Sequence, residues 1–163
     1  MHALFIGRFQ PFHNGHLHVI QDQITNFSKL IIGIGSSQYQ HTQQNPFSYE
    51  ERKTMITTVL DYEQITNYTI LAIPDIHDPP RWVDHVLTIT RDFTDVFTNN
   101  SHTAELFKEQ GFSTHMLGLY EKQKYSGEEI RRRMRHEEPW TDLVHPLVAA
   151  YLREINAEDR LKN

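Results

Sequence analysis

Residues 3–16 decide the fold class, and they read Ala3-Leu4-Phe5-Ile6-Gly7-Arg8-Phe9-Gln10-Pro11-Phe12-His13-Asn14-Gly15-His16. The first four are apolar and predict a short buried strand, and a helical pattern begins near Asn14. Gly7 stands between the two elements, where a residue without a Cβ lets the backbone approach a ligand. The free amides at the start of the following helix can donate to an anion, so this segment predicts a phosphate-binding turn.

The two histidines of this segment are spaced for one shared site. His13 and His16 are three residues apart, which places both imidazoles on one face at the mouth of the predicted helix. An imidazole can donate a hydrogen bond or carry a positive charge near neutral pH, and both suit a site where negative charge builds up on phosphoryl oxygens. Such a pair is often a surface or packing feature, but the surrounding residues favour the phosphate site.

Composition narrows the class of protein. The chain has 163 residues, no cysteine and a formal net charge of −5. This length suits a single domain, residues 1–163, whose core needs no disulfide. The absence of cysteine fits a reducing compartment, and apolar runs of about five residues are too short for a signal peptide or a membrane span. We therefore expect a cytoplasmic protein, and the negative charge argues against general nucleic-acid binding.

Short β-rich runs alternate with helical patterns along the chain. The expected strands are residues 3–6, 30–34, 68–73, 96–98 and 114–117. Parallel strands joined by right-handed helical crossovers form an open sheet covered on both faces. We therefore expect an α/β fold, a Rossmann-like open parallel five-stranded sheet with helices on both faces.

Two patterns predict helix starts. Ser48 with Glu51, and Ser126 with Glu129, have the spacing of a capping box. The second helix would carry the basic cluster of residues 131–135. Arg131 lies about one turn after Ser126 and is the candidate for an anionic ligand, while Arg132 and Arg135 are expected on a solvated face.

Other residues predict helix ends. Gly111 is placed to end a helix over residues 104–110, and Pro146 to begin the last helix. The tail, residues 157–163, is expected to be frayed surface.

The residues that carry chemistry follow the predicted strands. They lie in segments 7–16, 35–41, 74–82, 98–101 and 120–126. Because the carboxyl ends of parallel strands meet at one edge of a sheet, we expect a single ligand site at that edge.

The whole pattern resembles the archaeal-type nicotinamide-mononucleotide adenylyltransferases of the nucleotidylyltransferase superfamily. The stretch from Gly7 to His16 matches their signature, which includes His-x-Gly-His. Further matches follow in order at residues 32–38 with 41, 45–48 with 51–52, 74–76, 82–83 and 125–134. The resemblance implies that the chain transfers AMP from ATP to nicotinamide mononucleotide, giving NAD and pyrophosphate.

The resemblance also implies the site residues. The catalytic set would be His13, His16, Arg8 and Arg131. ATP would contact Gly7, Arg8, Phe9, His13, His16, Asn100, Ser126 and Arg131, and the mononucleotide would contact Ser36, Gln38, His41, Asp75 and Trp82. Mg²⁺ would accompany ATP, held mostly by phosphate oxygens and water, with no metal site of the protein's own. The nucleophile is already an anion, so no general base is expected. The family suggests a homo-oligomer.

Two of these residues keep a second interpretation. Trp82 can stack on a pyridinium ring, or it can be an ordinary core residue at the start of a helix. Asn100 can contact adenosine, or it can cap the next helix together with Ser101.

Three departures from the family pattern bear on the substrates. Gln44 stands where a basic residue is usual, and residues 78–81 replace the segment that supplies an asparagine. Glu128 places a carboxylate where the family has a shorter residue, close to the expected triphosphate. The second substrate is therefore less strongly implied than ATP.

Other functions remain to be weighed. The nearest alternative is another nucleotidylyltransferase, acting on phosphopantetheine, a flavin or a cytidylyl acceptor, although the Arg-Thr-x-Gly-Ile-Ser-Thr-like string of the cytidylyl group is absent. A non-catalytic nucleotide sensor is a second class. A metal-binding protein is a third, and a poor one, because His13, His16 and His18 have no carboxylate cluster nearby.

Overall fold

The computed structural model describes residues 1–116 and 125–162. These residues form two compact units. The sheet unit comprises residues 1–8, 21–37 and 67–116, and the helical unit comprises residues 9–20, 38–66 and 125–162. No helix among the described residues has the length and apolar character needed to cross a membrane.

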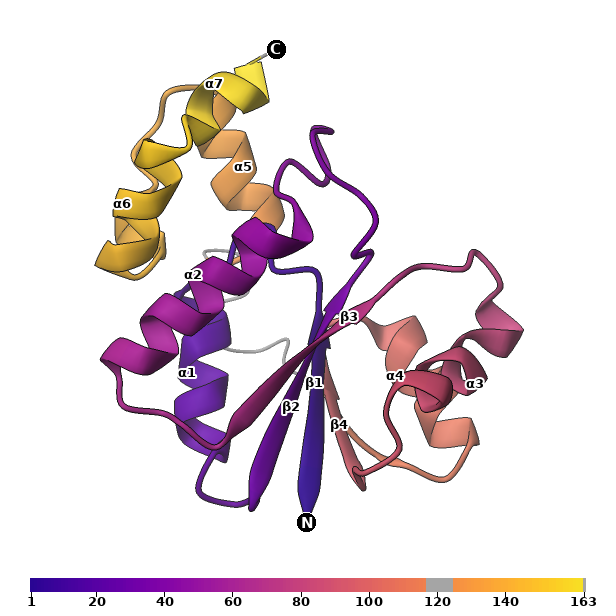
Figure 1. Cartoon of the computed structure of the whole chain (residues 1–163). Coiled ribbons are helices and arrows are strands. Elements are labelled where there is room, and N and C mark those ends of the chain that lie inside the picture. The colour runs from indigo at the N-terminus through magenta and orange to yellow at the C-terminus, as the bar shows by residue number, and fades with distance from the viewer. Residues whose placement is uncertain (117–124, 163) are drawn as a thin grey trace. The chain divides into compact units, whose positions relative to one another are not determined.

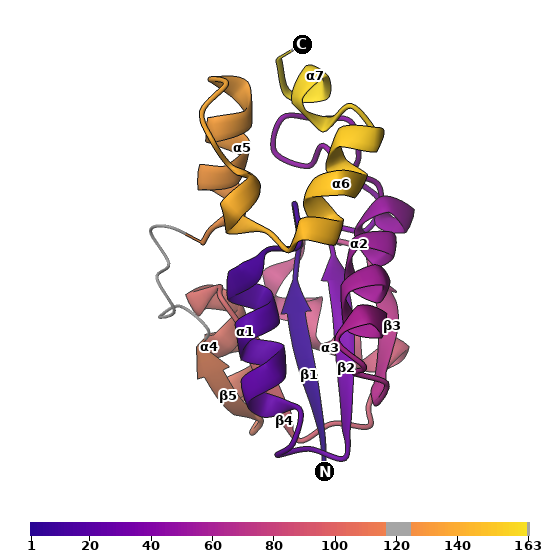
Figure 2. The same cartoon turned by 90° about the vertical axis from the view of Figure 1, so that its left-hand side faces the viewer.

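The sheet unit contains five parallel strands in the order β3-β2-β1-β4-β5 (Figures 1 and 2). Their bounds are β1 His2–Gly7, β2 Lys29–Gly35, β3 Tyr68–Ile73, β4 Asp95–Thr98 and β5 Ser113–Met116. The α/β class and the five-stranded parallel sheet are therefore confirmed. The fifth strand begins one residue earlier than expected, and Leu117 lies outside the described residues.

Two helices complete the sheet unit. Helix α3 is Pro79–Ile89 and helix α4 is Ser101–Glu109, and they lie together on one side of the sheet in Figure 1. Strand residues that alternate along β1 meet apolar residues of both helices in one core. Its buried members are Leu4, Ile6, Ile31, Ile73, Val83, Val86, Phe93, Val96 and Phe107. Helix α4 begins earlier than the expected residue 104, because Asn100 caps it through the amide of Thr103 at 3.0 Å.

The remaining helices belong mainly to the helical unit. They are α1 Asn14–Gln23, whose last three residues fall in the sheet unit, α2 Tyr49–Tyr62, α5 Gly127–Arg135, the short 3₁₀ helix η1 Thr141–Leu143, α6 Pro146–Glu154 and α7 Ala157–Lys162. Helix α6 contacts α2 and α7, and α7 also contacts α5. Figure 2 shows α5, α6 and α7 gathered near the carboxyl terminus.

The expectation of a frayed tail is wrong. Residues Ala157–Lys162 form helix α7, in which Ala157 and Leu161 are each 1% exposed. Arg160 also forms an ion pair with Glu51 of α2 at 2.8 Å. Six residues are too few to show a helical period, and both the apolar and the charged partners lie far away in the sequence.

The capping box at the start of α2 is confirmed. Ser48 Oγ accepts from the amide of Glu51 at 3.1 Å, and the amide of Ser48 donates to Glu51 Oε1 at 3.0 Å. Two of the amides left over at the helix start are thus satisfied reciprocally.

Candidate active site

The loop after β1 carries two histidines that cap helix α1. Nδ1 of His13 accepts from the backbone amides of Gly15, at 3.1 Å, and of His16, at 3.4 Å. The backbone amide of His13 in turn donates to Nδ1 of His16 at 3.1 Å. Amides in the first turn of a helix have no partner within it, so these imidazoles act as the two side chains of a capping box do. The predicted helix start at Asn14 is confirmed.

Hydrogen bonding and burial keep both imidazoles neutral. A ring nitrogen that accepts from an amide carries no proton, so neutral His13 and His16 hold their proton on Nε2. Burial lowers the pKa of His13 to about 3, and burial together with the charge of His13 lowers the pKa of His16 well below its usual value. The rings stack with centroids 3.6 Å apart. An imidazole at this site could donate a hydrogen bond or carry a positive charge. The geometry supports the first role, with Nε2–H as the donor.

An aromatic ring and a glycine pack closely around the pair. The ring centroid of Phe9 lies 4.7 Å from that of His16. A Cβ at Gly15 would come within 2.9 Å of Cε1 of His13 and 3.0 Å of Cβ of Tyr125. Glycine is needed here because of this close approach. The same contact places the segment before α5 beside the start of α1.

Gln10 joins three parts of the helical unit. Its side chain is 2% exposed; Nε2 donates to the carbonyl of Phe47 at 3.0 Å, and the amide of Phe47 donates to Oε1 at 2.9 Å. Its backbone carbonyl accepts a 2.7 Å hydrogen bond from Nη1 of Arg131, which is buried. A Cβ at Gly127 would lie 2.8 Å from this Nη1 and 2.9 Å from the Gln10 oxygen. Arg131 is therefore bonded directly to residues 9–16, the histidine loop, which carries both imidazoles and runs into the first turn of α1.

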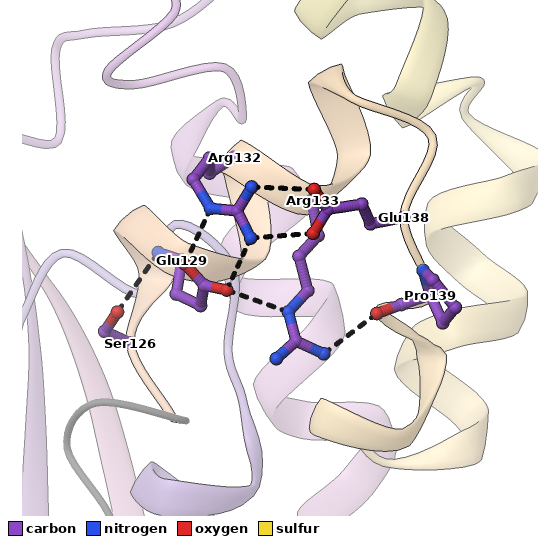
Figure 3. A network of polar contacts seen from close by, with 6 residues as sticks. All are labelled: Ser126, Glu129, Arg132, Arg133, Glu138 and Pro139. Carbon is purple, nitrogen blue, oxygen red and sulfur yellow. Dashed lines mark hydrogen bonds and ion pairs between the residues drawn. The ribbon is translucent and has the colours of Figure 1, made fainter.

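The start of α5 holds an ion-pair network, shown in Figure 3. Ser126 Oγ accepts from the amide of Glu129 at 3.1 Å, as expected of a helix cap. The Glu129 carboxylate accepts from Arg132 and Arg133, each at 2.9 Å, so it is not the second half of the predicted capping box. Glu138 also accepts from Arg132, at 2.7 Å. Hydrogen bonds from Arg132 and then Arg133 lower the pKa of Glu129 to about 2.

The basic cluster thus separates into two roles. Arg132, expected to be a solvated residue, is paired with two carboxylates, and Arg131 reaches the histidine loop. The helical unit brings His13, His16, Ser126 and Arg131 together, as the sequence predicts. Glu128, whose carboxylate raised doubt about the triphosphate, is exposed. Residues 120–124 of the segment expected after the fifth strand lie outside the described residues.

Most of the other predicted residues lie near one edge of the sheet unit. These are Gly7, Arg8, Ser36, Asp75, Trp82 and Asn100. Gly7 ends β1, and the others follow the carboxyl ends of β1, β2, β3 and β4, which share an edge because all strands are parallel. Strand order reverses direction between β1 and β4, and open α/β sheets bind ligands at such a point.

Local structure orients several of these residues. Ser36 has a φ of 47°, and His77 has a φ of 53°, both in the left-handed region that only tertiary context maintains in such residues. Asp75 Oδ1 accepts from the amide of His77 at 2.9 Å and so shapes the loop after β3. Asn100 caps α4, which confirms one of its two interpretations, and its contact with adenosine stays a prediction.

Trp82 takes part in the core of the sheet unit while remaining half-buried. Its ring stands edge-on to Phe107, with centroids 5.7 Å apart. The core interpretation is therefore observed, and its stacking on a substrate stays a prediction. Gln38 and His41, both exposed, belong to the helical unit, as does the exposed Gln44. Their contact with a mononucleotide stays a prediction.

A metal site made by the protein is not evident within the described parts of the chain. There, no three His, Asp or Glu side chains lie close enough together to hold an ion. A divalent ion that arrives with a nucleotide would take most of its ligands from phosphate and water.

Four residues that shape the site were not among those predicted to form it. They are Gln10, Gly15, Phe47 and Gly127. Gln10 and Gly15 lie inside the quoted segment, where a polar amide among apolar residues and a glycine within a helix start were available signals. Phe47 and Gly127 lie within the family-pattern matches at residues 45–48 and 125–134, but their contacts are with residues distant in sequence, which those matches do not identify.

The chain is similar to known proteins over most of its length. The family model described as cytidylyltransferase-like matches residues 4–133. The chain is 38% identical over 163 residues to the nicotinamide-nucleotide adenylyltransferase of Picrophilus torridus, with all of this chain and 96% of that protein covered. It is 41% identical over 162 residues to the protein of the same name from Pyrococcus horikoshii, with 99% of this chain and 87% of that protein covered.

Solved structures show the same fold. A bifunctional NMN adenylyltransferase/ADP ribose pyrophosphatase from Francisella tularensis matches with a TM-score of 0.77 at 24% sequence identity. The match covers 93% of this chain and 49% of that one, so this chain spans about half of the bifunctional protein. The likeness supports the Rossmann-like nucleotidyltransferase fold. Since a family model matches most of its length and its relatives are similar from end to end, the chain belongs to the cytidylyltransferase-like family, among the nicotinamide-nucleotide adenylyltransferases.

Proposed function

We propose that the chain transfers AMP from ATP to nicotinamide mononucleotide, giving NAD and pyrophosphate. A 5′-phosphate oxygen of the mononucleotide forms a bond to the α-phosphorus of ATP. The bond from that phosphorus to the oxygen bridging to the β-phosphate breaks, and its electron pair leaves with pyrophosphate. The attacking oxygen is already ionised, so no side chain has to remove a proton.

One observation carries the proposal: the histidine pair caps the start of α1, and Arg131 is bonded to Gln10 in the loop that leads into that helix. Nδ1 of His13 and of His16 are engaged by backbone amides, which leaves Nε2–H as the donor that each neutral ring presents. Arg131, buried and bonded to the same loop, supplies a guanidinium that stays charged at all relevant pH values. Donors held in place before the reaction can stabilise charge on the α-phosphoryl and leaving oxygens.

Further site residues complete the assignment. We assign Gly7, Arg8, Phe9, Asn100 and Ser126 to ATP, in addition to the histidines and Arg131. The mononucleotide is assigned to Ser36, Gln38, His41, Asp75 and Trp82. Each assignment is supported by the matching motif of the family and by the position of the residue after a strand or at a helix start.

The nucleotide is proposed to react as its Mg²⁺ complex. Mg²⁺ keeps several water ligands and binds substrate phosphates readily, which suits a site without a carboxylate cage. A crystal structure of the Francisella tularensis protein holds AMP and a manganese ion. Comparing rates with Mg²⁺ and Mn²⁺ across a range of concentrations would determine the preferred ion.

A single assay tests the proposed reaction. The protein is incubated with ATP, Mg²⁺ and one of several phosphorylated acceptors: nicotinamide mononucleotide, nicotinate mononucleotide, phosphopantetheine or a flavin mononucleotide. Pyrophosphate and NAD should form together when nicotinamide mononucleotide is present, and ATP alone should give neither. Pyrophosphate with a different acceptor only would assign the chain to another branch of the superfamily, and no turnover with any acceptor would favour the nucleotide sensor.

We also propose that residues 1–163 act as one nucleotidylyltransferase domain, within a cytoplasmic homo-oligomer. Unfolding that coincides when followed by tryptophan fluorescence and by far-UV circular dichroism would support one domain. Light scattering coupled to size-exclusion chromatography would give the oligomeric state.

A further inference from the structure

The Gln10 side chain is matched to one residue of another segment. Its amide group has a donor and an acceptor, and these satisfy both the carbonyl and the amide of Phe47, at 3.0 and 2.9 Å. Few side chains can do this, because a carboxylate cannot donate and a thioether does neither at useful strength. Gln10 is 2% exposed and Phe47 is fully buried, so water cannot replace these bonds.

The backbone of Gln10 holds the proposed catalytic arginine. Nη1 of Arg131 donates to the Gln10 carbonyl at 2.7 Å. The lack of room for a Cβ at Gly127, 2.8 and 2.9 Å from these two atoms, shows how closely the junction is packed. A shift of the Gln10 backbone would therefore move Arg131 as well as the histidines that follow three and six residues later.

Phe47 is itself firmly held. It precedes Ser48, which forms the capping box of α2 with Glu51. Arg160 of α7 binds both oxygens of that Glu51 carboxylate at 2.8 Å. Phe47, the partner of the Gln10 side chain, thus adjoins a helix start that is held by a capping box and an ion pair.

We infer that Gln10 is a positioning residue for adenylyl transfer. Its side chain bonds the histidine loop to the residue before α2, and its backbone carbonyl holds Arg131 beside that loop. This inference rests on the proposed function. Reaction rates depend steeply on the alignment of the reacting groups, whereas ground-state binding of the nucleotides draws on many contacts. Loss of the Gln10 side-chain bonds should therefore affect kcat more than KM.

Two variants test the role of the side chain. Gln10→Met keeps the length and loses both hydrogen bonds, while Gln10→Glu keeps the acceptor and loses the donor. We expect kcat to fall about 10- to 100-fold in Gln10→Met. The fall should be at least as large in Gln10→Glu, because its buried carboxylate would face the Phe47 carbonyl without a proton to donate. KM for ATP and for the mononucleotide should change less than about threefold.

A matched control separates positioning from loss of stability. Trp140 is 3% exposed, lies in the same unit and donates from Nε1 to Glu158 at 2.6 Å. Trp140→Phe removes this one partly buried hydrogen bond and should lower Tm while leaving kcat near the wild-type value. An equal loss of kcat in Trp140→Phe and Gln10→Met at equal Tm would overturn the inference, and so would a wild-type kcat in Gln10→Met.

A second measurement does not depend on turnover. The ¹⁵N chemical shifts of the His13 and His16 rings report the tautomer and the hydrogen bonds at Nδ1. We expect Gln10→Met to change these shifts and Trp140→Phe to leave them as in the wild type. Wild-type activity with nicotinamide mononucleotide is measured separately and tests the proposed function. Even if that activity were absent, unchanged ring shifts in Gln10→Met would refute the positioning role and altered shifts would support it.

Discussion

Gly127→Ala should displace Arg131 from the histidine loop. The new Cβ would lie 2.8 Å from Nη1 of Arg131 and 2.9 Å from the carbonyl oxygen of Gln10, about half an ångström inside ordinary contact. The Gln10 oxygen belongs to the backbone, so the flexible arginine is the group that yields. Its hydrogen bond, from a charged donor, contributes about 1.5–3 kcal/mol.

The net effect on stability follows from two opposing terms. Alanine favours a helix over glycine by up to about 1 kcal/mol, which offsets part of the lost hydrogen bond. A net destabilisation of about 1–2 kcal/mol would lower Tm by about 2–8 °C in a chain of this size. A displaced Arg131 should reduce kcat by about 10²-fold, because it would no longer meet the phosphates in the required geometry.

The assay compares Gly127→Ala with Gly111→Ala. Gly111 has a φ of 89° and open space around an added Cβ, so alanine there is strained by conformation alone. We expect a similar fall in Tm for both variants, measured by differential scanning calorimetry, and a fall in kcat for Gly127→Ala only. Close packing at Gln10 is expected to keep Arg131 in place for the reaction. A wild-type kcat in Gly127→Ala would refute this, and so would an equal fall in kcat in both variants.

Four further predictions address single residues. His16→Ala should lower kcat by about 10² to 10⁴-fold, because a preorganised donor is lost, and a variant with normal turnover would make His16 purely a helix cap. Trp82→Ala should raise KM for the mononucleotide more than for ATP if the ring stacks on the substrate, whereas equal changes with a lower Tm would leave only its observed core role. In the ligand-free protein, lowering the pH from about 6.5 to 3 should reduce the free energy of unfolding by up to about 1.4 kcal/mol for each pH unit. The reason is that His13 binds a proton in the unfolded chain over this range but not in the folded chain, where its pKa is about 3. His13→Asn should remove this contribution from a plot of Tm against pH. Arg160→Gln should lower the free energy of unfolding by about 1 kcal/mol at pH 7, and the difference from the wild type should disappear once acid protonates Glu51. Equal stability of the two proteins at pH 7 would show that the ion pair contributes nothing.

Local patterns predicted the elements that short stretches of sequence determine. Alternating strand and helix signals located all five strands, and Ser48 with Glu51 correctly marked the start of α2. The meeting of His13 and His16 was predicted because the two residues lie three apart at a helix start, and phosphate binding by this turn stays a prediction.

Features that depend on distant residues were missed or misjudged. The Gln10 side chain binds a residue 37 positions away, and Arg131 binds one 121 positions away. The tail forms α7 because Leu161 is buried and Arg160 finds Glu51, neither of which a six-residue window shows. Glu129 failed to complete its predicted capping box because two arginines on its own helix compete for the same carboxylate.

The tautomers that these hydrogen bonds imply would let the histidine pair serve the proposed polyanion site. Two stacked imidazoles with centroids 3.6 Å apart cannot both be charged, because like charges at that separation repel strongly in a site away from water. Each Nδ1 is committed to a backbone amide, so a single proton on each Nε2 satisfies both rings without any net charge. The permanent positive charge then has to come from a group that cannot lose its proton, and Arg131 is such a group, bonded to the same loop. Directional donors and fixed charge are in this way supplied by different residues: backbone amides at the start of α1 orient the imidazoles, and the Gln10 carbonyl orients Arg131.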